Sequence, residues 1–360
     1  MRNAIRLFLT SFRAGAAAVA LVVLASTSYA QTITTIDPPN STFTIAQAIN
    51  PVGQIVGYYL DGSGIHGFLR QPSGAITSFN VSRDGFQLGT FATAINPAGQ
   101  ITGYYDTLFF TTHSFLRQPD GTITLFFVNS DSTASTALGS APLSFFTGDG
   151  DAPVGISQAG QIAGVWGNAR YRSFLRQRDG TVTTFGVIPE MGIESTQAQA
   201  INSTGQITGS YNAGDASVGF LRQPNGTIIT FNPPGSSGTI ATAINSTGQI
   251  TGSYYDGSVS HGFLRQPGGS IITFDPAGSS NTQAKGINST CQIAGYYLGA
   301  DSTYHGFLRQ PDGSITTFDA PGAGTGSNQG TFAQAINPAG KITGYYIAAD
   351  NTYHGFVRSQ

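Results

Sequence analysis

Histidine is the residue type in this sequence that most directly offers chemistry, and its spacing is regular. Each of the five histidines precedes a Phe by two positions, and they are His66, His113, His261, His305 and His354. Imidazole can move protons near neutral pH and can exchange hydrogen bonds with hydroxyl-rich ligands. A catalytic His normally has unique surroundings, so a fivefold copy favours a repeated structural hydrogen bond, to backbone or to a Tyr of the preceding strand. The functional alternative is a set of equivalent pockets in which His, Tyr and Asp bind a sugar.

A second candidate site consists of unusual residues gathered in one stretch of the chain. They are Trp166, Arg170, Tyr171, Arg172, Glu190 and Glu194. The indole is the only one in the sequence and offers a flat apolar face for stacking on a sugar, while two guanidinium groups can bind a carboxylate. The two Glu are also the only ones. These residues predict a single ligand-binding cleft; the alternative is that this stretch has diverged without gaining a function.

Seven arginines form a third repeated set, because each closes a Phe-Leu-Arg or Phe-Val-Arg motif. They are Arg70, Arg117, Arg176, Arg222, Arg265, Arg309 and Arg358. A buried guanidinium needs a partner, since an unpaired charge in a protein core is strongly destabilising. An Asp lies three residues later in only some motifs, so backbone carbonyls are the partners that all could share. We expect these arginines to be structural; the alternative is an anion-binding ring.

Motifs of established catalytic mechanisms are absent. The sequence has no Gly-x-Ser-x-Gly, no His-Glu-x-x-His, no Cys cluster, no phosphate-binding loop and no EF-hand spacing of aspartates. Cys291 stands where other repeats have a turn Gly, which indicates a tolerated substitution rather than a nucleophile. Asp149 and Asp151 could contribute to a calcium site, but an acidic loop tip is the favoured interpretation. The sequence therefore predicts no catalytic residue, no metal and no cofactor.

These residues are distributed over seven repeat units, numbered 1 to 7 in chain order. Each unit has a first anchor, an Ile followed by Asn or Ser, at Ile49, Ile95, Ile156, Ile201, Ile244, Ile287 and Ile336. The second anchor is the Phe of the Phe-Leu-Arg motif. Successive first anchors are 43 to 49 residues apart, except for one gap of about 60. A period of this length, with several short strands in each unit, is typical of β-propeller blades.

Unit 5 shows how the strands of one unit are expected to lie. Its predicted strands are separated by Gly, Pro, Asn and Asp turns, and they span 239–245, 249–255, 261–266 and 270–275. Four antiparallel strands in meander order make one blade, so we expect an all-β, seven-bladed β-propeller. Unit 7 lacks a fourth strand, and residues 31–37 match it. The N-terminal strand is therefore expected to pair beside 353–358 and close the ring.

The predicted domain organisation is a signal peptide followed by a single propeller domain. Three Arg precede an apolar run at 14–24, and Ser28-Tyr29-Ala30 places small residues before a cut at Gln31. The run is too short to span a membrane. Residues 31–360 then form the propeller, with an insertion at 127–152 before the third blade. We expect a secreted protein, extracellular or periplasmic.

Composition narrows the choice of partner. With 39% hydrophobic residues and one Cys, the chain fits neither a disordered protein nor a disulfide scaffold. Removing the three leader Arg leaves 13 basic against 18 acidic residues, a net charge of −5. This excess of acid argues against nucleic acid and against anionic membrane as partners. We expect a monomer that binds carbohydrate or another cell-surface polymer.

The repeats resemble a known bacterial family. The segments Ala-Ile-Asn-Ser-Thr-Gly-Gln-Ile-Thr-Gly at 243–252 and His-Gly-Phe-Leu-Arg at 261–265 are similar to the extracellular HAF repeat. The similarity covers nearly all of the chain after residue 30, and Gly262 stands where the name of the family has Ala. The resemblance implies a secreted repeat protein of undefined activity, and it implies no catalytic residue.

Two functional hypotheses follow. The first is a non-catalytic binding or interaction propeller, because equivalent polar residues recur in five units. The second is an enzyme acting on an acidic polysaccharide, for example a lyase, with one site near the third blade. In such a lyase Arg would neutralise a uronate carboxylate while Tyr or His moves the proton. The repeated residues favour the binding protein.

Overall fold

The computed structural model describes residues 31–82, 89–107, 111–128, 150–167, 171–187 and 195–359. They belong to one compact unit, residues 31–360. Every regular element in these ranges is a β-strand, so the prediction of an all-β protein is confirmed. No helix in the described ranges is long and apolar enough to cross a membrane. The predicted signal peptide and residues 129–149 of the predicted insertion lie outside the described residues.

The strands follow the repeat units closely. Strand β1 is Thr32–Ile36, and unit 1 contains β2 (Phe43–Ile49), β3 (Ile55–Asp61), β4 (Gly64–Arg70) and β5 (Ile76–Phe79). Unit 2 contains β6 (Thr90–Ile95), β7 (Ile101–Asp106), β8 (Thr112–Arg117) and β9 (Ile123–Phe126). Unit 3 contains β10 (Gly150–Ile156), β11 (Ile162–Gly167), β12 (Arg172–Arg176) and β13 (Val182–Phe185). Unit 4 contains β14 (Thr196–Ile201), β15 (Ile207–Ala213), β16 (Ala216–Arg222) and β17 (Ile228–Phe231).

The remaining units repeat this order. Unit 5 contains β18 (Gly238–Ile244), β19 (Ile250–Tyr255), β20 (Ser260–Arg265) and β21 (Ile271–Phe274). Unit 6 contains β22 (Asn281–Ile287), β23 (Ile293–Leu298), β24 (Tyr304–Arg309) and β25 (Ile315–Phe318). Unit 7 contains β26 (Gly330–Ile336), β27 (Ile342–Ile347) and β28 (Tyr353–Ser359).

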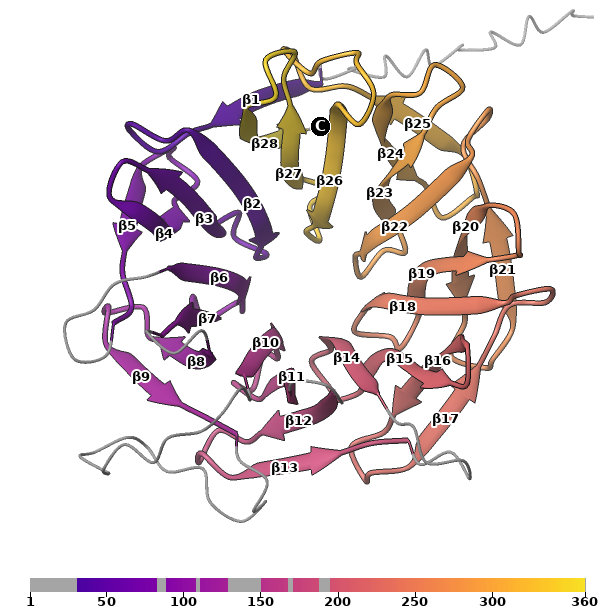
Figure 1. Cartoon of the computed structure of the whole chain (residues 1–360). Coiled ribbons are helices and arrows are strands. Elements are labelled where there is room, and N and C mark those ends of the chain that lie inside the picture. The colour runs from indigo at the N-terminus through magenta and orange to yellow at the C-terminus, as the bar shows by residue number, and fades with distance from the viewer. Residues whose placement is uncertain are drawn as a thin grey trace, which may run out of the picture. The chain divides into compact units, whose positions relative to one another are not determined.

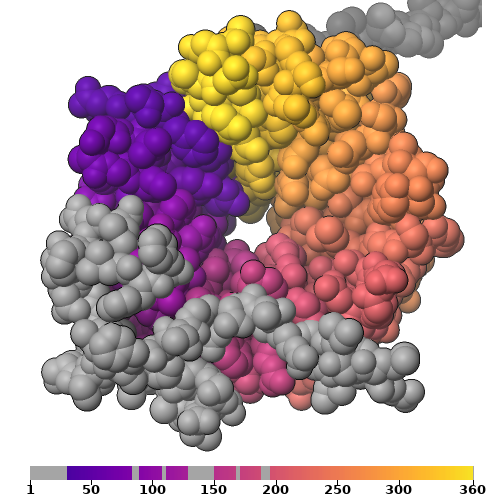
Figure 2. Space-filling view, viewed as in Figure 1, coloured from indigo at the N-terminus to yellow at the C-terminus, as the bar shows by residue number. Residues whose placement is uncertain are grey.

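Antiparallel pairing joins consecutive strands within each unit. In unit 5, for example, β19 pairs with both β18 and β20, and β20 pairs with β21. Strand β1 pairs antiparallel with β28 over its whole length, from Thr32 opposite Ser359 to Ile36 opposite Gly355. Single parallel bridges, such as Phe43 opposite Tyr353, connect some neighbouring units into a 16-stranded sheet. The first strand of each unit lies nearest the centre (Figure 1), where the space-filling view shows a hollow (Figure 2).

The repeated glycine inside the second strand is required by close backbone packing. A Cβ on Gly252 would collide with the carbonyl oxygen of Ile240 on the neighbouring strand, and the same holds for Gly57 and Ile45. The first strand bulges next to this contact, because its register with the second strand shifts between Ala241 and Ala243. Glycine is therefore the residue that lets the two inner strands approach.

Asparagine side chains tie the inner ends of the units together. In six junctions the Nδ2 of a first-anchor Asn donates to a backbone carbonyl of the following unit, over 3.0 to 3.2 Å. The donors are Asn50, Asn96, Asn202, Asn245, Asn288 and Asn337. All six are buried, and Asn337 donates to the carbonyl of Asn50, which links unit 7 to unit 1. Unit 3 has Ser157 at this position.

The Phe-Leu-Arg arginines connect the outer parts of neighbouring units. Six of the seven guanidinium groups lie over a Phe ring of the preceding unit, with 4.8 to 5.1 Å between Cζ and the ring centroid. For Arg265 the ring is Phe231, and its Nη1 also donates to the carbonyl of Gln266 over 3.3 Å. The backbone partners expected from the sequence are present for six of the seven arginines, whereas the buried Nε and Nη1 of Arg358 have no hydrogen-bond partner among the described residues. The stacking on Phe, a cation–π contact, was not predicted.

Cys291 occupies the turn position that the sequence comparison assigned to it. Its φ is 65°, in the left-handed region, and the equivalent Gly248 has a φ of 82°. Because a side chain is strained there, Cys291→Gly should leave the free energy of unfolding unchanged or raise it by up to about 1 kcal/mol. The matched control is Gly248→Cys, which should be destabilising, since its Cβ would lie 3.2 Å from the Oε1 of Gln206. Urea unfolding of both variants tests this, and a clear loss of stability in Cys291→Gly would contradict it.

Candidate functional site

The histidines occupy one register position, opposite an aromatic residue on the preceding strand. In unit 5, Tyr254 on β19 faces His261 on β20. The same register pairs Trp166 with Arg172 in unit 3 and Tyr211 with Val218 in unit 4. Trp166 and Arg172 of the second candidate site therefore occupy, in unit 3, the register position that Tyr and His occupy in other units.

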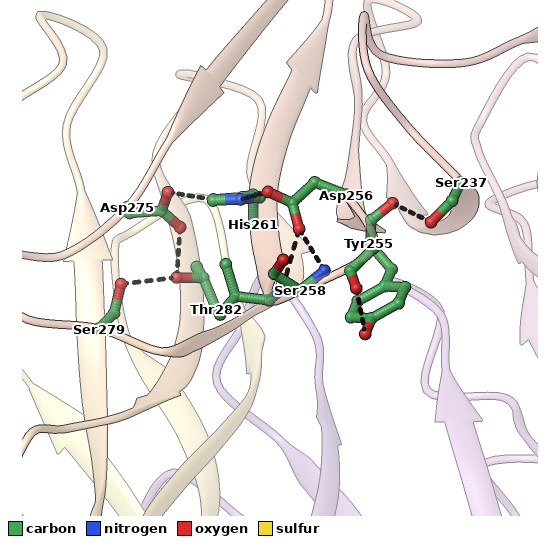
Figure 3. Close-up of polar contacts among 10 residues, drawn as sticks. Ser237, Tyr255, Asp256, Ser258, His261, Asp275, Ser279 and Thr282 are labelled. Atoms are coloured by element: carbon green, nitrogen blue, oxygen red, sulfur yellow. Dashed lines mark hydrogen bonds and ion pairs between the residues drawn. The ribbon is translucent and has the colours of Figure 1, made fainter.

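His261 lies between two carboxylates that come from different loops (Figure 3). Its Nδ1 is 2.6 Å from Oδ2 of Asp275, and its Nε2 is 3.2 Å from Oδ2 of Asp256. Asp256 follows β19, whereas Asp275 follows β21 and also accepts a 2.6 Å hydrogen bond from the hydroxyl of Thr282 in unit 6. Carboxylates accept only, so both contacts are satisfied together by the imidazolium form. The cluster clamps unit 5 to the start of unit 6.

Three other histidines have comparable hydrogen-bond partners on their ring nitrogens. We call each histidine with these partners a clamp. His305 contacts Asp319 through Nδ1 at 3.0 Å and Asp301 through Nε2 at 3.2 Å. His354 contacts Asp37, at the end of β1, through Nδ1 at 2.8 Å. His66 replaces one of these carboxylates by an amide, and its partners are Asn80 at 2.6 Å and Asp61 at 3.0 Å.

The expected partners of the histidines were therefore wrong in part. The sequence analysis predicted hydrogen bonds to backbone or to Tyr, whereas the structure shows carboxylate, amide and hydroxyl partners. The Tyr of the preceding strand packs against the imidazole instead, with 5.1 Å between the ring centroids of Tyr254 and His261. One partner of His261 and of His305 lies in the preceding loop, five and four residues earlier, whereas Asp275 and Asp319 lie 14 residues later. The sequence analysis considered neither spacing. With both ring nitrogens bonded to the protein, His261 is not poised as a general base.

His113 differs from the other histidines in that its carboxylate partner is buried. Its Nδ1 is 3.3 Å from Oδ1 of Asp151 in unit 3, whose Oδ2 accepts hydrogen bonds from the backbone N–H, at 2.9 Å, and from the hydroxyl of Ser114. Asp151 is 2% exposed and lies in β10, so the interpretation of this residue as part of an acidic loop tip was wrong. Burial raises the pKa of the Asp151 carboxyl, against the opposing hydrogen bonds from His113 and Ser114. Asp149 lies outside the described residues.

The structure places three of the six residues predicted for the unit 3 cleft. Trp166 packs against the core formed by Leu116, Phe126 and their neighbours, and its Nε1 is buried. Tyr171 and Arg172 are exposed on the edge of this unit. Trp166 and Arg172 are thus neighbours across two strands, and the indole is partly buried. Arg170, Glu190 and Glu194 lie outside the described residues.

A continuous band of aromatic side chains was missed by the sequence analysis. It runs through units 2, 1, 7 and 6, and its members are Tyr104, Phe91, Tyr58, Phe43, Tyr353, Tyr345, Phe332, Tyr304 and Tyr296. Successive ring centroids lie 4.5 to 6.3 Å apart. We call this set the aromatic band. The contacts between units are Tyr58 with Phe91, Phe43 with Tyr353, and Phe332 with both Tyr296 and Tyr304.

The tyrosines of the aromatic band keep their hydroxyl groups available. None of the six makes a side-chain hydrogen bond to another described residue, and none of these oxygens is among the buried unpaired atoms. The rings are half-buried. Desolvation raises the pKa of Tyr104 and of Tyr296 to about 12 and raises that of Tyr58 as well. The band therefore combines apolar ring surface with neutral phenol groups that can donate and accept hydrogen bonds.

Comparison with known proteins shows the fold. No protein-family model matches the chain, and no curated protein matches it. The β-propeller domain of the Trilobed protease from Pyrococcus furiosus superposes with a TM-score of 0.58 at 9% identity, covering 88% of this chain and 95% of that one. The chain has a β-propeller fold. A catalytically inactive virginiamycin B lyase from Staphylococcus aureus, solved with Quinupristin, gives a TM-score of 0.54 at 12% identity, covering 91% of this chain and 99% of that one.

Within the propeller, one sequence signal distinguishes the units that carry the aromatic band. The glycine of the second strand is followed by Tyr-Tyr in units 1, 2, 6 and 7, but by Ser-Tyr in units 4 and 5. The second Tyr of each pair lies beneath the histidine and is buried, as Tyr59 is. Neighbouring strand residues point to opposite faces of a sheet, so the first Tyr, such as Tyr58, points to the face opposite that of the second Tyr. Period-two alternation could have revealed this position.

In the clamps of His261 and His305, the pKa of one aspartate is lowered and the pKa of the histidine is raised. Hydrogen bonds from the backbone N–H groups of Val259 and Ser258, with a further one from His261, lower the pKa of Asp256 to about 2. Desolvation lowers the pKa of His261, but the hydrogen bonds and charges of Asp275 and Asp256 outweigh it, and the net shift is upward.

His305 and Asp301 behave in the same way. Hydrogen bonds from Thr303 and then from His305 lower the pKa of Asp301 to about 2. Desolvation opposes but does not cancel the effect of Asp319 and Asp301, so the pKa of His305 is raised. The clamps of His261 and His305 are thus most stable when Asp256 and Asp301 are ionised and the two histidines are protonated.

These shifts predict how the stability of the propeller depends on pH. The histidine contribution is complete below the ordinary pKa of 6.5 and is lost as pH rises through the raised pKa of His261 and His305. The aspartate contribution is complete above 3.8 and is lost as pH falls toward 2. The melting temperature measured across pH 3 to 9 should therefore be highest between about pH 4 and 6.5. Replacing both His261 and His305 by Gln should flatten the decline above this window, and an unchanged profile would contradict the assignment.

Proposed function

We propose that this protein is a secreted or periplasmic, non-catalytic β-propeller with seven blades that binds carbohydrate chains along the aromatic band. The HAF-like repeats and the predicted signal peptide support export. The proposal assigns one blade to each repeat unit and closes the ring with β1 as the outer strand of the last blade. The pairing of β1 with β28 and the hydrogen bond from Asn337 to Asn50 support this closure.

The observation that carries the binding function is the continuity of the aromatic band. Sugars present apolar C–H faces and hydroxyl edges, and half-buried Tyr rings with free hydroxyls match both. The band crosses four consecutive units without a gap in ring contacts. A surface of this kind fits several residues of an extended chain rather than a single small sugar.

The histidine clamps support a non-catalytic role. The ring nitrogens of His261 and His305 are engaged by carboxylates of the protein itself, and the same arrangement recurs around the fold. Repetition of this kind is typical of a structural element. Three of the six residues of the unit 3 site, where the lyase alternative would act, lie outside the described residues: Arg170, Glu190 and Glu194.

The test uses substitutions that the fold already accepts. Units 4 and 5 carry Ser210 and Ser253 at the position of Tyr58 and Tyr345, so Tyr58→Ser and Tyr345→Ser should fold. After a glycan array has identified an oligosaccharide that binds, calorimetry should show each variant about 3- to 30-fold weaker. Tyr255→Ser is the matched control, because Tyr255 is 45% exposed and lies outside the band; its affinity should not change.

Other outcomes would assign the ligand to a different site or contradict the proposed function. If Trp166→Ala and Arg172→Ala weaken binding while the band variants do not, the ligand site belongs to unit 3. If His305→Ala alone abolishes binding, the repeated clamps are the ligand pockets. Cleavage of a uronate polymer, followed at 235 nm, would overturn the non-catalytic assignment.

A further inference from the structure

A lysine lies at one end of the aromatic band, at a position where all other units carry neutral residues. Lys285 is on β22, where the register with β23 shifts between Ala284 and Gly286 and leaves Lys285 as the bulged residue. The equivalent residues of the other first strands are Gln47, Thr93, Val154, Gln199, Thr242 and Gln334. First strands lie nearest the centre of the ring (Figure 1). Lys285 is therefore the one charge among the seven bulged side chains.

The ammonium group of Lys285 contacts the band directly. Its Nζ lies 5.4 Å from the ring centroid of Tyr296, the last member of the band in unit 6. The edge of Tyr296 in turn contacts Phe332 of unit 7, at 5.0 Å between centroids. A cation placed against the end of a row of aromatic rings can reach the same ligand that the rings contact.

This ammonium group has no carboxylate partner among the described residues. The ion pairs in the described part of the chain all involve histidines. The acids that unit 6 supplies, Asp301 and Asp319, are both held by His305. Burial lowers the pKa of Lys285, which means that the protein itself does not compensate its charge. An anionic group arriving with a ligand would do so.

We propose that the aromatic band ends in a carboxylate subsite at Lys285 and that the ligand is an acidic polysaccharide, with uronate residues. The proposal rests on the function proposed above and adds the class of sugar. The rings contact the sugar faces, and Nζ of Lys285 donates to a uronate carboxylate at the unit 6 end. Because the protein carries a net negative charge, the attraction is local rather than long-range, and specificity depends on this one contact.

The test compares two ligands that differ only in charge. An oligogalacturonate and the same oligomer with its carboxyl groups reduced to neutral hydroxymethyl groups are titrated into the protein by calorimetry. The wild type should bind the acidic oligomer about tenfold more tightly or better, the effect of one charge-assisted hydrogen bond. Lys285→Gln should remove this preference and leave the affinity for the neutral oligomer unchanged. Three other units carry Gln at this position, so the variant should fold.

The control is Lys341→Gln. Lys341 is the only other lysine and stands where most units have Gln at the start of the second strand, so this variant should keep the preference. An unchanged ratio of acidic to neutral affinity in Lys285→Gln would overturn the carboxylate subsite, and the proposed function would stand if Tyr58→Ser still weakens both ligands. Failure of both oligomers to bind the wild type would overturn the subsite as well, whereas the glycan array decides the proposed function separately.

Discussion

Deletion of residues 31–38 should lower the free energy of unfolding by at least about 4 kcal/mol, because it removes a paired strand and a buried side chain. Ile36 is 1% exposed and packs in the same cluster as Phe68 and Val357. The deletion also removes Asp37, the partner of His354 at 2.8 Å. The exposed backbone edge of β28 would then be free to pair with other chains, so aggregation is expected along with the lower melting temperature.

Two point variants separate the contributions of this strand. Ile36→Ala should cost about 2 to 5 kcal/mol through lost burial and the cavity that remains. Thr34→Ala is the matched control, because Thr34 is exposed on the same strand, and its effect should stay within about 0.5 kcal/mol. Chemical unfolding in urea measures the stability of the deletion variant and of both point variants. A deletion variant as stable as the parent would contradict the closed ring.

Asp151→Ala should have the second large effect, a loss of about 2 to 5 kcal/mol, because it leaves buried donors without an acceptor. The groups affected are the backbone N–H and the hydroxyl of Ser114, together with the imidazole of His113. All of them lie at the junction between units 2 and 3. An alanine variant with unchanged stability would show that Asp151 makes no net contribution there.

The control restores the residues that other units use. Thr is the usual residue at the position of Asp151, and Gly is the usual one at Ser114, so the double variant Asp151→Thr with Ser114→Gly should recover most of the loss. The double variant should also differ from the wild type in how its free energy of unfolding depends on pH. The raised pKa of Asp151 means that its stabilising contribution is complete below 3.8 and declines as pH rises through the raised value. The free energy of unfolding of the wild type should therefore rise relative to that of the double variant as pH falls.

Much of the fold could be predicted because its rules are local. The turn positions and the β-branched runs repeat from unit to unit, and Cys291 was recognised by its place in that pattern. The pairing partner of β1 could be predicted because the seventh unit ends one strand short. By contrast, contacts between units depend on which faces meet after folding. The hydrogen bond from Asn245 to the carbonyl of Asn288 and the stack of Arg265 on Phe231 involve residues 43 and 34 positions apart, and no local pattern contains them.

The candidate site was harder to predict for a related reason. Sequence reasoning searched for residues that are unusual, and so it selected Trp166, whose indole is partly buried against the core of unit 3. The aromatic band is built from a common residue type at a position where only some units have it. Tyr58 and Tyr59 are neighbours of the same type, yet one contacts Phe91 and the other lies beneath His66. Residue type alone could not separate their roles.

The asparagine contacts between the inner ends of the units also bear on how such a chain can arise and be rearranged. Units 2, 4, 5, 6 and 7 each donate through their own Asn to the next unit and place their Arg on a ring of the previous one. Each of these five units therefore carries the residues for both of its junctions. A gene encoding one unit could be duplicated in tandem, and every new junction would be compatible from the start. For the same reason the order of units has no required beginning, and circularly permuted chains that start at another loop would preserve all of these contacts.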